Sequence, residues 1–489
     1  MIRRGESRTR AAIAALALAV AAPLACSSSE PPAPAPAPLP CPGPSQAGSP
    51  LSIRCGALVD RDGREVTLTG INARVGGVFD VSFDDGRAPL EPIPAFGADD
   101  ARRIRELGFD ALRLPIQWSG VEPTETGGFD EAYLDRVASA VALARAARLY
   151  VLVDLHQDAY SKEIGEDGAP YWAIVPPPPA KLGGPLVDLD ARRLSKPVLD
   201  AFGTFFGPSA DGARLRGRYA RMAAHVAARF AEDDAVIGIE AFNEPIAKTP
   251  ELVAFHREVL AAVRSAAPKK LVFFEPSATR NLLDRADLPS SPLGPGTVYA
   301  PHVYTAAFAT EAARATVTRE AVQRSYVAAR EEADAWQAPL VVTEWGFPPS
   351  APNFPDYARW HAELAEEVRA HLFFWVWKET SQGSWGFFDG APGGAVTERA
   401  NVVAALARVR LEVAAGRIAS LARPTPTRLR VELEGVPGSR ENLVSFGARW
   451  APRGAWCDGA TVAVGAAEPA PITCGGEGRH VLEIESAPR

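Results

Sequence analysis

Residues 236–245 read VIGIEAFNEP, an apolar run that closes on Glu244 and a proline. Residues 339–346 read PLVVTEWG and repeat the pattern, with Glu344 at the end of the run and a glycine two positions later. Short apolar runs bounded by Pro or Gly are typical of buried strands. In α/β barrels the carboxyl ends of the strands open on one face, and that face carries the reactive groups. The two stretches therefore predict a barrel with two carboxylates at its mouth.

Strand-like and helix-like segments alternate over most of the chain. The strands expected are 66–72, 111–116, 149–155, 236–242, 271–275, 298–303, 340–344 and 371–377, and the helices expected are 99–107, 131–147, 213–230, 251–266, 318–336 and 356–370. Eight strands interleaved with helices predict a (β/α)8 TIM barrel. A doubly wound open sheet is the competing topology, but no Gly-x-Gly-x-x-Gly follows the first strand.

Two segments depart from this alternation. Residues 158–208 carry little periodicity and many Gly, Pro and aromatic residues, which predicts a binding loop or lid over the barrel mouth. After a helix expected to end near Ala415, short alternating runs at 429–433, 444–450, 461–464 and 480–484 predict a small C-terminal β-sandwich. The predicted limits are 51–420 for the catalytic barrel and 424–489 for the sandwich. Trp450 or Trp456 could bind carbohydrate there, although a core role is the favoured interpretation.

The N-terminus has the pattern of a targeting segment. Arginines precede an apolar run at 11–22 that is too short to span a bilayer, and small residues lead to Cys26. We expect residues 1–25 to be a lipoprotein-type signal peptide, Cys26 to carry a membrane anchor, and the Pro/Ala/Ser-rich residues 26–50 to form a tether; plain secretion is the alternative. The other four cysteines suggest the pairs Cys41–Cys55 and Cys457–Cys474, although three pairings are possible.

Composition excludes some partners. The formal net charge is -7 and no basic stripe is present, so nucleic acid is not an expected partner. No Cys-x-x-Cys or His-Glu-x-x-His spacing indicates a metal, and we expect no cofactor and no obligate protein partner.

Polar side chains close most of the expected strands, so they should converge on one pocket. The candidates are Arg113, His156, Asp158, Asn243, Glu244, His302, Tyr304, Glu344 and Trp377. Glycoside hydrolysis needs two carboxyl groups, one to protonate the leaving oxygen and one to attack or to activate water. The acid needs a raised pKa, and the nucleophile needs donors such as Arg113 or Tyr304 to keep it ionised. His156 and His302 suit hydroxyl recognition, and Trp377 suits the floor beneath a sugar ring.

The motifs Phe242-Asn243-Glu244-Pro245 and Thr343-Glu344-Trp345-Gly346 resemble glycoside hydrolase family 5, over about residues 60 to 415. The resemblance implies a retaining double displacement, with Glu244 as acid/base and Glu344 as nucleophile. It also implies that Arg113, His156, Asn243, His302, Tyr304 and Trp377 line the subsite of the cleaved sugar. Retention predicts a separation of about 5 Å between the two carboxyl groups.

Within that family the chain is most similar to endoglycoceramidases and related glycosylceramidases. The motifs that carry this likeness are 154–158 (DLHQD), 167–173 (DGAPYWA), 273–276 (FFEP) and 377–379 (WKE). The likeness implies that Asp158 binds sugar hydroxyls and that a glycolipid is the substrate. The loop after the first strand, residues 72–78, reads NARVGGV, where a sugar-binding Lys is expected. An endo-β-glucanase or mannanase acting on polysaccharide is the nearest alternative, and a catalytically inactive carbohydrate-binding surface lipoprotein is the alternative from another class.

Overall fold

The computed structural model describes residues 48–289, 291–379, 385–391, 394–436 and 438–489. Nine parallel strands form one curled sheet in the order β10-β11-β12-β4-β5-β6-β7-β8-β9. Only two residues separate β9 from β10, which are two halves of one barrel strand, and a parallel bridge between Tyr299 and Leu340 joins β9 to the segment before β11. The sheet therefore closes on itself, and the predicted (β/α)8 barrel is confirmed.

The barrel strands lie where the apolar runs predict them. Their bounds are β4 (Thr69–Asn72), β5 (Ala111–Gln117), β6 (Tyr150–His156), β7 (Val236–Glu240), β8 (Leu271–Phe274), β9 (Thr297–Tyr299), β10 (His302–Val303), β11 (Val341–Trp345) and β12 (His371–Phe374). Every residue of β7, β8, β11 and β12 is buried. Strands enclosed on both faces read as continuous apolar runs, which is the pattern that marked them in the sequence.

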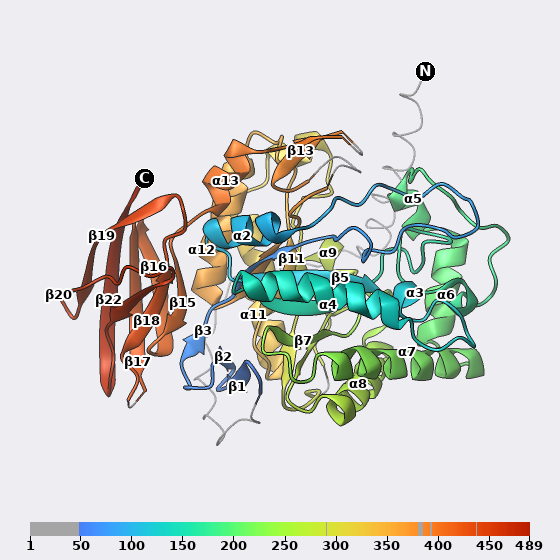
Figure 1. Ribbon diagram of the computed structural model, residues 1–489, viewed down its shortest axis with the longest axis horizontal. Helices are drawn as coiled ribbons and strands as arrows, with labels where there is room; N and C mark the ends of the chain where they lie inside the picture. Colours follow the sequence, from blue (N-terminus) through green and yellow to red (C-terminus); the bar gives the residue numbers. More distant parts are fainter. Residues whose placement is uncertain (1–47, 290, 380–384, 392–393, 437) are drawn as a thin grey trace, which may run out of the picture.

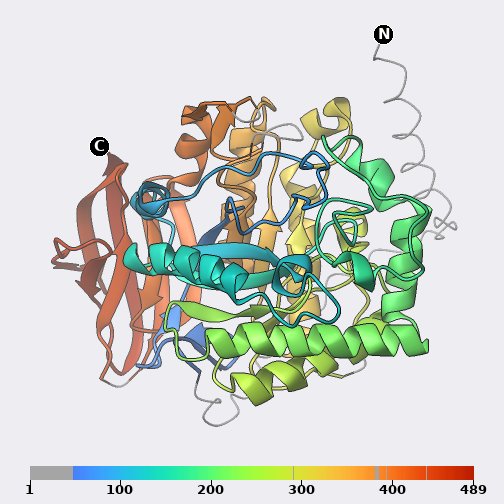
Figure 2. The same cartoon turned by 45° about the vertical axis from the view of Figure 1, so that its right-hand side comes forward.

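Helices surround this barrel. They are α2 (Ala98–Glu106), α3 (Trp118–Val121), α4 (Glu131–Ala146), α5 (Leu189–Arg193), α6 (Lys196–Phe206), α7 (Ala210–Arg229), α8 (Thr249–Ala266), α9 (Arg280–Leu283), α10 (Glu311–Ala315), α11 (Arg319–Trp336), α12 (Phe354–Val368) and α13 (Ala400–Leu406), with a 3-10 turn at Tyr171–Ala173. Side chains of Asp130, Ser209 and Thr318 accept backbone N–H groups at the starts of α4, α7 and α11, which fixes where these helices begin. Figure 2 shows α7 and α8 packed side by side along the barrel.

The long insertion after β6 lies at the end of the barrel opposite the C-terminal sheets (Figure 1). It is more helical than predicted, because it contains α5 and α6. In α6, Val198, Ala201, Phe202 and Phe205 recur at helical spacing and are buried. The rings of Phe205 and Phe206 contact Phe242, at centroid distances of 5.7 and 5.6 Å, so the insertion is fastened next to the end of β7.

The C-terminal part is a β-sandwich, as predicted, but it begins earlier in the chain than the expected helix allowed. One sheet has the order β1-β2-β3-β15-β18-β21 and the other has the order β16-β17-β22-β19-β20. Their bounds are β1 (Ser52–Arg54), β2 (Ala57–Val59), β3 (Glu65–Val66), β15 (Arg410–Ala414), β16 (Gly416–Thr425), β17 (Arg428–Gly435), β18 (Glu441–Ser445), β19 (Trp450–Cys457), β20 (Ala460–Val462), β21 (Ala470–Thr473) and β22 (Gly478–Pro488), with a separate hairpin of β13 (Phe388–Gly390) and β14 (Val396–Glu398).

The helix expected to reach Ala415 ends at Leu406. Residues 408–413 alternate charged and apolar side chains, which is the period of a strand, and 410–414 form β15. Likewise, the run expected at 444–450 ends as a strand at Ser445. The limits 51–420 and 424–489 stay predictions. In Figure 1 the blue strand β3 lies at the boundary between the barrel and the red sheets, and it pairs with β15.

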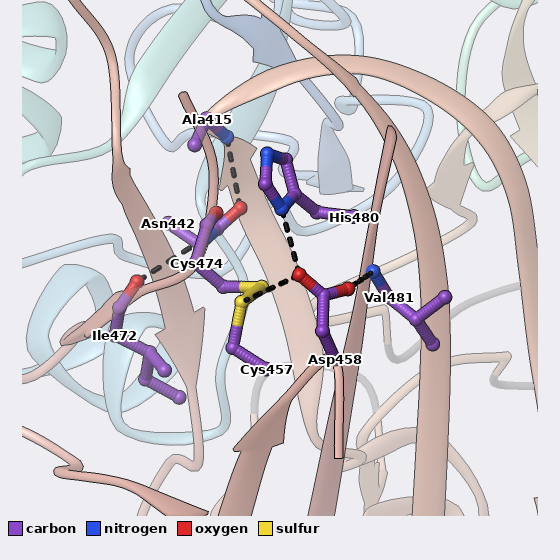
Figure 3. The surroundings of a disulfide bond; sticks show 8 residues. All are labelled: Ala415, Asn442, Cys457, Asp458, Ile472, Cys474, His480 and Val481. Atoms are coloured by element: carbon purple, nitrogen blue, oxygen red, sulfur yellow. Dashed lines mark hydrogen bonds and ion pairs between the residues drawn. A yellow bond between two sulfur atoms is a disulfide. The ribbon is translucent and has the colours of Figure 1, made fainter. Parts of the chain in front are cut away.

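The predicted disulfide Cys457–Cys474 is present, and it joins the end of β19 in one sheet to the residue after β21 in the other. Asn442 stands behind it and donates to the carbonyl oxygens of Cys474 and Ile472 at 2.7 and 3.2 Å (Figure 3). Cys26 and Cys41 lie outside the described residues, so the anchor and the pair Cys41–Cys55 stay predictions. Among the residues that the structure describes, no helix has the length and apolar character needed to cross a bilayer.

The tryptophans of the sandwich have structural contacts. Trp450 packs against the sandwich core, and its indole N–H donates to the carbonyl of Ala407 at 2.7 Å. The guanidinium of Arg428 lies 5.9 Å from the ring of Trp456. The contacts of Trp450 agree with the interpretation of a core tryptophan, whereas Trp456 is only half-buried, and its role stays a prediction.

Candidate active site

The carboxyl ends of the barrel strands bring two glutamates face to face. Glu344 lies on β11, and Glu244 follows β7 by four residues. A carboxylate oxygen of Glu244, one of Glu344 and a ring nitrogen of His302 all lie within 4.8 Å of one another. Retaining glycosidases hold their two carboxyl groups about 5 to 5.5 Å apart, whereas inverting enzymes leave room for a water between them. The spacing therefore favours direct attack by one carboxylate.

Glu344 is surrounded by donors. The guanidinium of Arg113 donates to Oε1, the hydroxyl of Tyr304 donates to Oε2 at 2.8 Å, and Nδ1 of His302 lies 3.5 Å from Oε2. The residue is only 5% exposed, so these contacts act in a medium of low dielectric constant. They stabilise the negative charge that a nucleophile needs, and they fix the carboxylate toward the space before Glu244.

Arg113 serves the site and the barrel core together. It is fully buried on β5, and it contacts Glu240 at 2.5 Å and Asp154 at 3.1 Å in addition to Glu344. Burial alone would lower the pKa of Arg113, but the carboxylates raise it well above the ordinary value. The guanidinium also donates to Oδ1 of Asn243 at 2.8 Å. Arg113 therefore remains charged and ties strands β5, β7 and β11 together beneath the site.

Glu244 is held through its backbone as well as its carboxylate. Its φ of 42° lies in the left-handed region, which costs a non-glycine residue free energy and often marks a functional position. The backbone N–H donates to Oε2 of Glu275 at 3.1 Å. At the side chain, Oε1 accepts from Asn281 at 2.5 Å and faces Nδ1 of His302 at 2.8 Å. These contacts hold the carboxyl group opposite Glu344.

The pKa of the acid Glu244 is not raised, contrary to the prediction. The carboxyl group with a raised pKa is Glu275, which follows the next strand, β8. Burial raises the pKa of Glu244, but the hydrogen bond from His302 and the positive charges of His302, Arg193 and His156 together outweigh it and bring the pKa to about 2. Burial lowers the pKa of His302, but Glu275 and Glu344 raise it well above its ordinary value. Burial raises the pKa of Glu275 to about 8. In the free site the proton therefore rests on His302, and a transfer to Glu244 Oε1 supplies the acid.

Glu275 completes this chain of groups. It follows β8 and is 3% exposed, and its Oε1 lies 3.3 Å from Nε2 of His302. Because Glu275 contacts both the histidine ring and the backbone of Glu244, it orients the two groups that share the proton. The sequence offered a signal for it, since Glu275-Pro276 closes its strand in the same way as Glu244-Pro245.

The structure brings His156, Asn243 and Asp158 to the same region. His156 Nδ1 lies 2.6 Å from Asp154; burial lowers the pKa of His156, but Asp154 and Asp167 raise it to about 9. Asn243 donates to the carbonyl of Gln157 at 3.0 Å, which fixes its amide. Asp158 accepts from Arg193 of α5 at 2.8 Å, so a sugar hydroxyl would share this carboxylate with the insertion.

Trp377 is not part of the site, which corrects the prediction. Its side chain is 1% exposed, its indole N–H donates to Asp100 at 3.0 Å, and its ring packs on Phe388 with centroids 4.9 Å apart. The strand β12 ends at Phe374, three residues before the expected end. The strand-end tryptophan is therefore Trp375, whose ring stacks on His156 with centroids 5.7 Å apart and 11° between the planes.

Arg74 does not replace the expected lysine. Its guanidinium lies 2.5 Å from Glu91, 3.3 Å from Glu166 and 3.5 Å from Glu379. The side chain is 1% exposed, so these carboxylates rather than a sugar take up its donors. No motif in the sequence indicated Asn281, which lies in α9, seven residues after the end of β8.

The carboxylates near His302 have the spacing of metal ligands, but their charge is already compensated. Glu240, Glu275 and His302 form a second such group beside Glu244, His302 and Glu344. Arg113 contacts Glu240 and Glu344, and the pKa of His302 is raised, so positive charge already stands where a cation would bind. A third group contains Cys457, whose sulfur is in the disulfide.

The model of the cellulase family (glycosyl hydrolase family 5) matches residues 59–381, which include every barrel strand and both glutamates. The chain belongs to this family. The matched residues end before β13, so the C-terminal sheets, with the exception of β3 and the last residue of β2, lie outside the family match.

Two curated relatives share part of the chain. Endoglycoceramidase I of Rhodococcus hoagii is 30% identical over 278 residues, which are 50% of this chain and 51% of that protein. A glucosylceramidase of Aspergillus fumigatus is 31% identical over 132 residues, which are 24% of this chain and 17% of that protein. The chain thus spans about half the length of the first of these relatives, and less of the second.

Solved structures share the fold over nearly the whole described chain. An endogalactoceramidase has a TM-score of 0.71 at 24% identity, covering 89% of this chain and 100% of that one. Endo-glycoceramidase II from Rhodococcus sp., in complex with ganglioside GM3, has a TM-score of 0.70 at 23% identity, covering 88% and 99%. At these identities the likeness concerns the fold, and it includes the C-terminal sandwich as well as the barrel.

Proposed function

We propose that this chain is a retaining β-glycosidase that releases the glycan of a glycolipid, such as a glycosylceramide, from its lipid. The observation that carries the proposal is the pair Glu244 and Glu344, with carboxylate oxygens within 4.8 Å across the barrel mouth. Membership of glycosyl hydrolase family 5 supports the glycosidase chemistry. The relatives named endoglycoceramidase and glucosylceramidase support a glycolipid substrate.

The contacts of the two glutamates define the steps. Glu344 attacks the anomeric carbon, and the bond from that carbon to the glycosidic oxygen breaks while Glu244 gives its proton to this oxygen. The product is a glycosyl ester of Glu344 and a free alcohol. Water then attacks the same carbon, Glu244 takes its proton, and the ester bond to Glu344 breaks. Two inversions retain the anomeric configuration, and both carboxyl groups return to their first state.

The loop after β4 does not offer an apolar surface to a lipid. Phe79 and Val81 are 4% and 3% exposed and pack with Leu90 in a small core of their own. The exposed apolar side chains lie elsewhere: Leu282 and Leu283 on α9 are 65% and 62% exposed. They directly follow Asn281, whose amide donates to Glu244, and this neighbourhood supports a lipid aglycone on the side of the acid.

Hydrolysis of a polysaccharide is the second candidate, because the matching family model carries the description cellulase. We would compare release of sugar from a fluorescent glycosphingolipid, carboxymethylcellulose and mannan. We expect cleavage of the glycosphingolipid between the first sugar and the lipid. Activity on the polymers alone would refute the glycolipid substrate. Glu344→Gln should abolish all hydrolysis, and unchanged hydrolysis would refute the assigned nucleophile. Absence of hydrolysis of every substrate by the wild type would instead restore the alternative of a binding protein.

We also propose that the chain is exported and held at a membrane through a lipid on Cys26. The support is the sequence alone: the arginines, the short apolar run and the small residues before Cys26, followed by the Pro/Ala/Ser-rich tether. Incorporation of labelled fatty acid and membrane fractionation test this proposal. Cys26→Ser should lose the label and leave the membrane fraction, whereas a membrane-bound Cys26→Ser protein would refute the anchor.

A further inference from the structure

A cavity of about 1030 Å³ lies at the base of the barrel, and neither of the two glutamates lines it. Its walls come from the start of β4, the C-terminal ends of α11 and α12, and strands β15 and β16 of the sandwich. It therefore sits between the barrel and the C-terminal sheets, at the end opposite the insertion. The proposed glycosidase reaction does not use this space.

The wall of this cavity is strongly cationic. Nine arginine and lysine residues line it, against three aspartate and glutamate residues. The chain as a whole has a formal net charge of -7. His371, the one histidine among the described residues of the wall, adds no charge, because burial lowers its pKa to about 3. The cavity wall thus has an excess of six positive charges, whereas the chain as a whole is acidic.

Three arginines come together where β15 and β16 meet α12. Arg423 is satisfied by Glu366, whose oxygens it contacts at 2.9 and 2.7 Å. Arg410 donates to the carbonyl of Gly108 at 2.9 Å, and its guanidinium lies 4.4 Å from the centre of the Phe109 ring. Neither contact gives Arg410 a direct carboxylate partner.

Arg408 has the weakest compensation of the three. Its Nη1 is buried and has no hydrogen-bond partner among the described residues. Burial and the positive charge of Arg423 lower the pKa of Arg408, Glu366 and Glu363 oppose this, and the net result is a pKa of about 10. Burial lowers the pKa of Arg410 to about 9; Asp110 raises it, and Arg408 and Arg423 lower it. The negative charges near this cluster are thus the carboxylate of Glu366, which Arg423 already binds, and the more distant Glu363 and Asp110.

A guanidinium keeps its proton in proteins, so this cluster cannot relieve its repulsion by becoming neutral. A buried donor without an acceptor and a buried charge without a counter-charge each cost free energy. A tetrahedral oxyanion would remove both costs, because guanidinium groups bind its oxygens in a bidentate manner.

We propose that the cavity binds an oxyanion of the phosphate class against Arg408, Arg410 and Arg423. The anion is either free phosphate or the phosphate of an anionic lipid headgroup. It neutralises the excess positive charge at the junction and thereby fastens the sandwich to the barrel.

Calorimetric titration of the purified full chain with inorganic phosphate, at constant ionic strength in chloride, tests this site. We expect saturable binding, and a melting temperature that rises with phosphate concentration. Arg408→Gln should weaken binding at least about tenfold, as expected for the loss of one charge-assisted contact. The matched control is Arg453→Gln, because Arg453 is an exposed arginine on β19 that does not line the cavity.

Arg408→Lys provides a second variant, since it keeps the charge but loses the planar fork, and it should bind with intermediate affinity. Absence of saturable binding to the wild type, or equal binding by Arg408→Gln and Arg453→Gln, would overturn the proposal. Sedimentation with phosphatidylglycerol and phosphatidylcholine vesicles separates the two sources. Binding to the anionic vesicles that phosphate competes away and Arg408→Gln loses assigns a lipid headgroup, whereas binding of free phosphate alone assigns the free ion.

Discussion

Asn281 offers the sharpest test of the proton arrangement, because one hydrogen bond links it to the acid. Its amide donates to Glu244 Oε1 at 2.5 Å, and Asn281→Ala removes this donor while His302 stays in place. A hydrogen bond to a charged group contributes about 1.5–3 kcal/mol. Since 1.36 kcal/mol corresponds to one pKa unit, the pKa of Glu244 should rise by about one to two units.

The direction of the effect on activity follows from the role of Glu244. The acid must carry a proton, so kcat/KM falls on the alkaline side where the shared proton is lost. A higher pKa of Glu244 favours its protonated form, and the alkaline limb should move to higher pH by up to about one to two units. At the optimum, kcat should fall because the carboxyl group is less well oriented.

The measurement is kcat/KM against pH with an aryl β-glycoside that the wild type cleaves. The matched control is Asn401→Ala, because the amide of Asn401 donates to a backbone carbonyl, that of Pro349, at 2.9 Å and lies outside the site. The control should leave both limbs unchanged. An alkaline limb that stays in place in Asn281→Ala, or moves to lower pH, would refute the claim that Asn281 stabilises the ionised acid.

Three further predictions follow from the same geometry. Glu244→Gln should lower kcat by about 10²–10⁴, less for aryl glycosides with good leaving groups than for poor ones, and an equal loss for both would contradict its role as acid. Trp377→Ala should cost about 3–5 kcal/mol in urea unfolding but leave KM unchanged, whereas Trp375→Ala should raise KM; the reverse pattern would restore Trp377 to the site. Burial lowers the pKa of His256 to about 4 and of His371 to about 3, so their contribution to stability is complete above about pH 6.5 and is lost as the pH falls toward these values. Unfolding free energies measured from neutral to acidic pH should fall by up to about 3 kcal/mol for His256 and about 5 kcal/mol for His371, and His256→Gln should flatten that dependence.

The barrel could be predicted from the sequence because its strands are enclosed on both faces. Val341 and Val342 are fully buried, and the strand pairs on one side with β10 and on the other with β12, so only apolar residues fit until the chain reaches the mouth. The change from apolar to polar at Glu344 marks the point where the strand leaves the core. The same change marks Glu244 and Glu275.

The site could be predicted only as far as the strand ends. Asn281 reaches Glu244 from α9, and no period or motif indicates which loop residue folds back on the acid. Trp377 was misplaced because the apolar run continues past the true end of β12, into residues that pack on Phe387 and Phe388. An apolar run gives the buried length of a segment, but it does not tell where a strand gives way to a buried loop.

The same limit applied to α6 and β15. In α6 the apolar spacing is helical, but the surrounding Gly and Pro residues masked it. The strand β15 is only five residues long, so its alternation is brief, and it follows the alanine-rich α13. Short elements carry few periods, and tertiary pairing decides their structure.

The pairing of β3 with β15 determines the order in which the chain can fold. Val66 lies opposite Val413 and Glu65 lies opposite Ala414, so partners in one sheet are separated by almost the whole barrel. During synthesis the first three strands leave the ribosome long before their partner exists, and the six-stranded sheet cannot form until the barrel between them is complete. The six-stranded sheet thus forms after the barrel has been synthesised, and its β3–β15 pair joins the residues just before the barrel to those just after it. A fragment that begins at β15 would lack β1 to β3 and expose an unpaired strand edge, which favours aggregation.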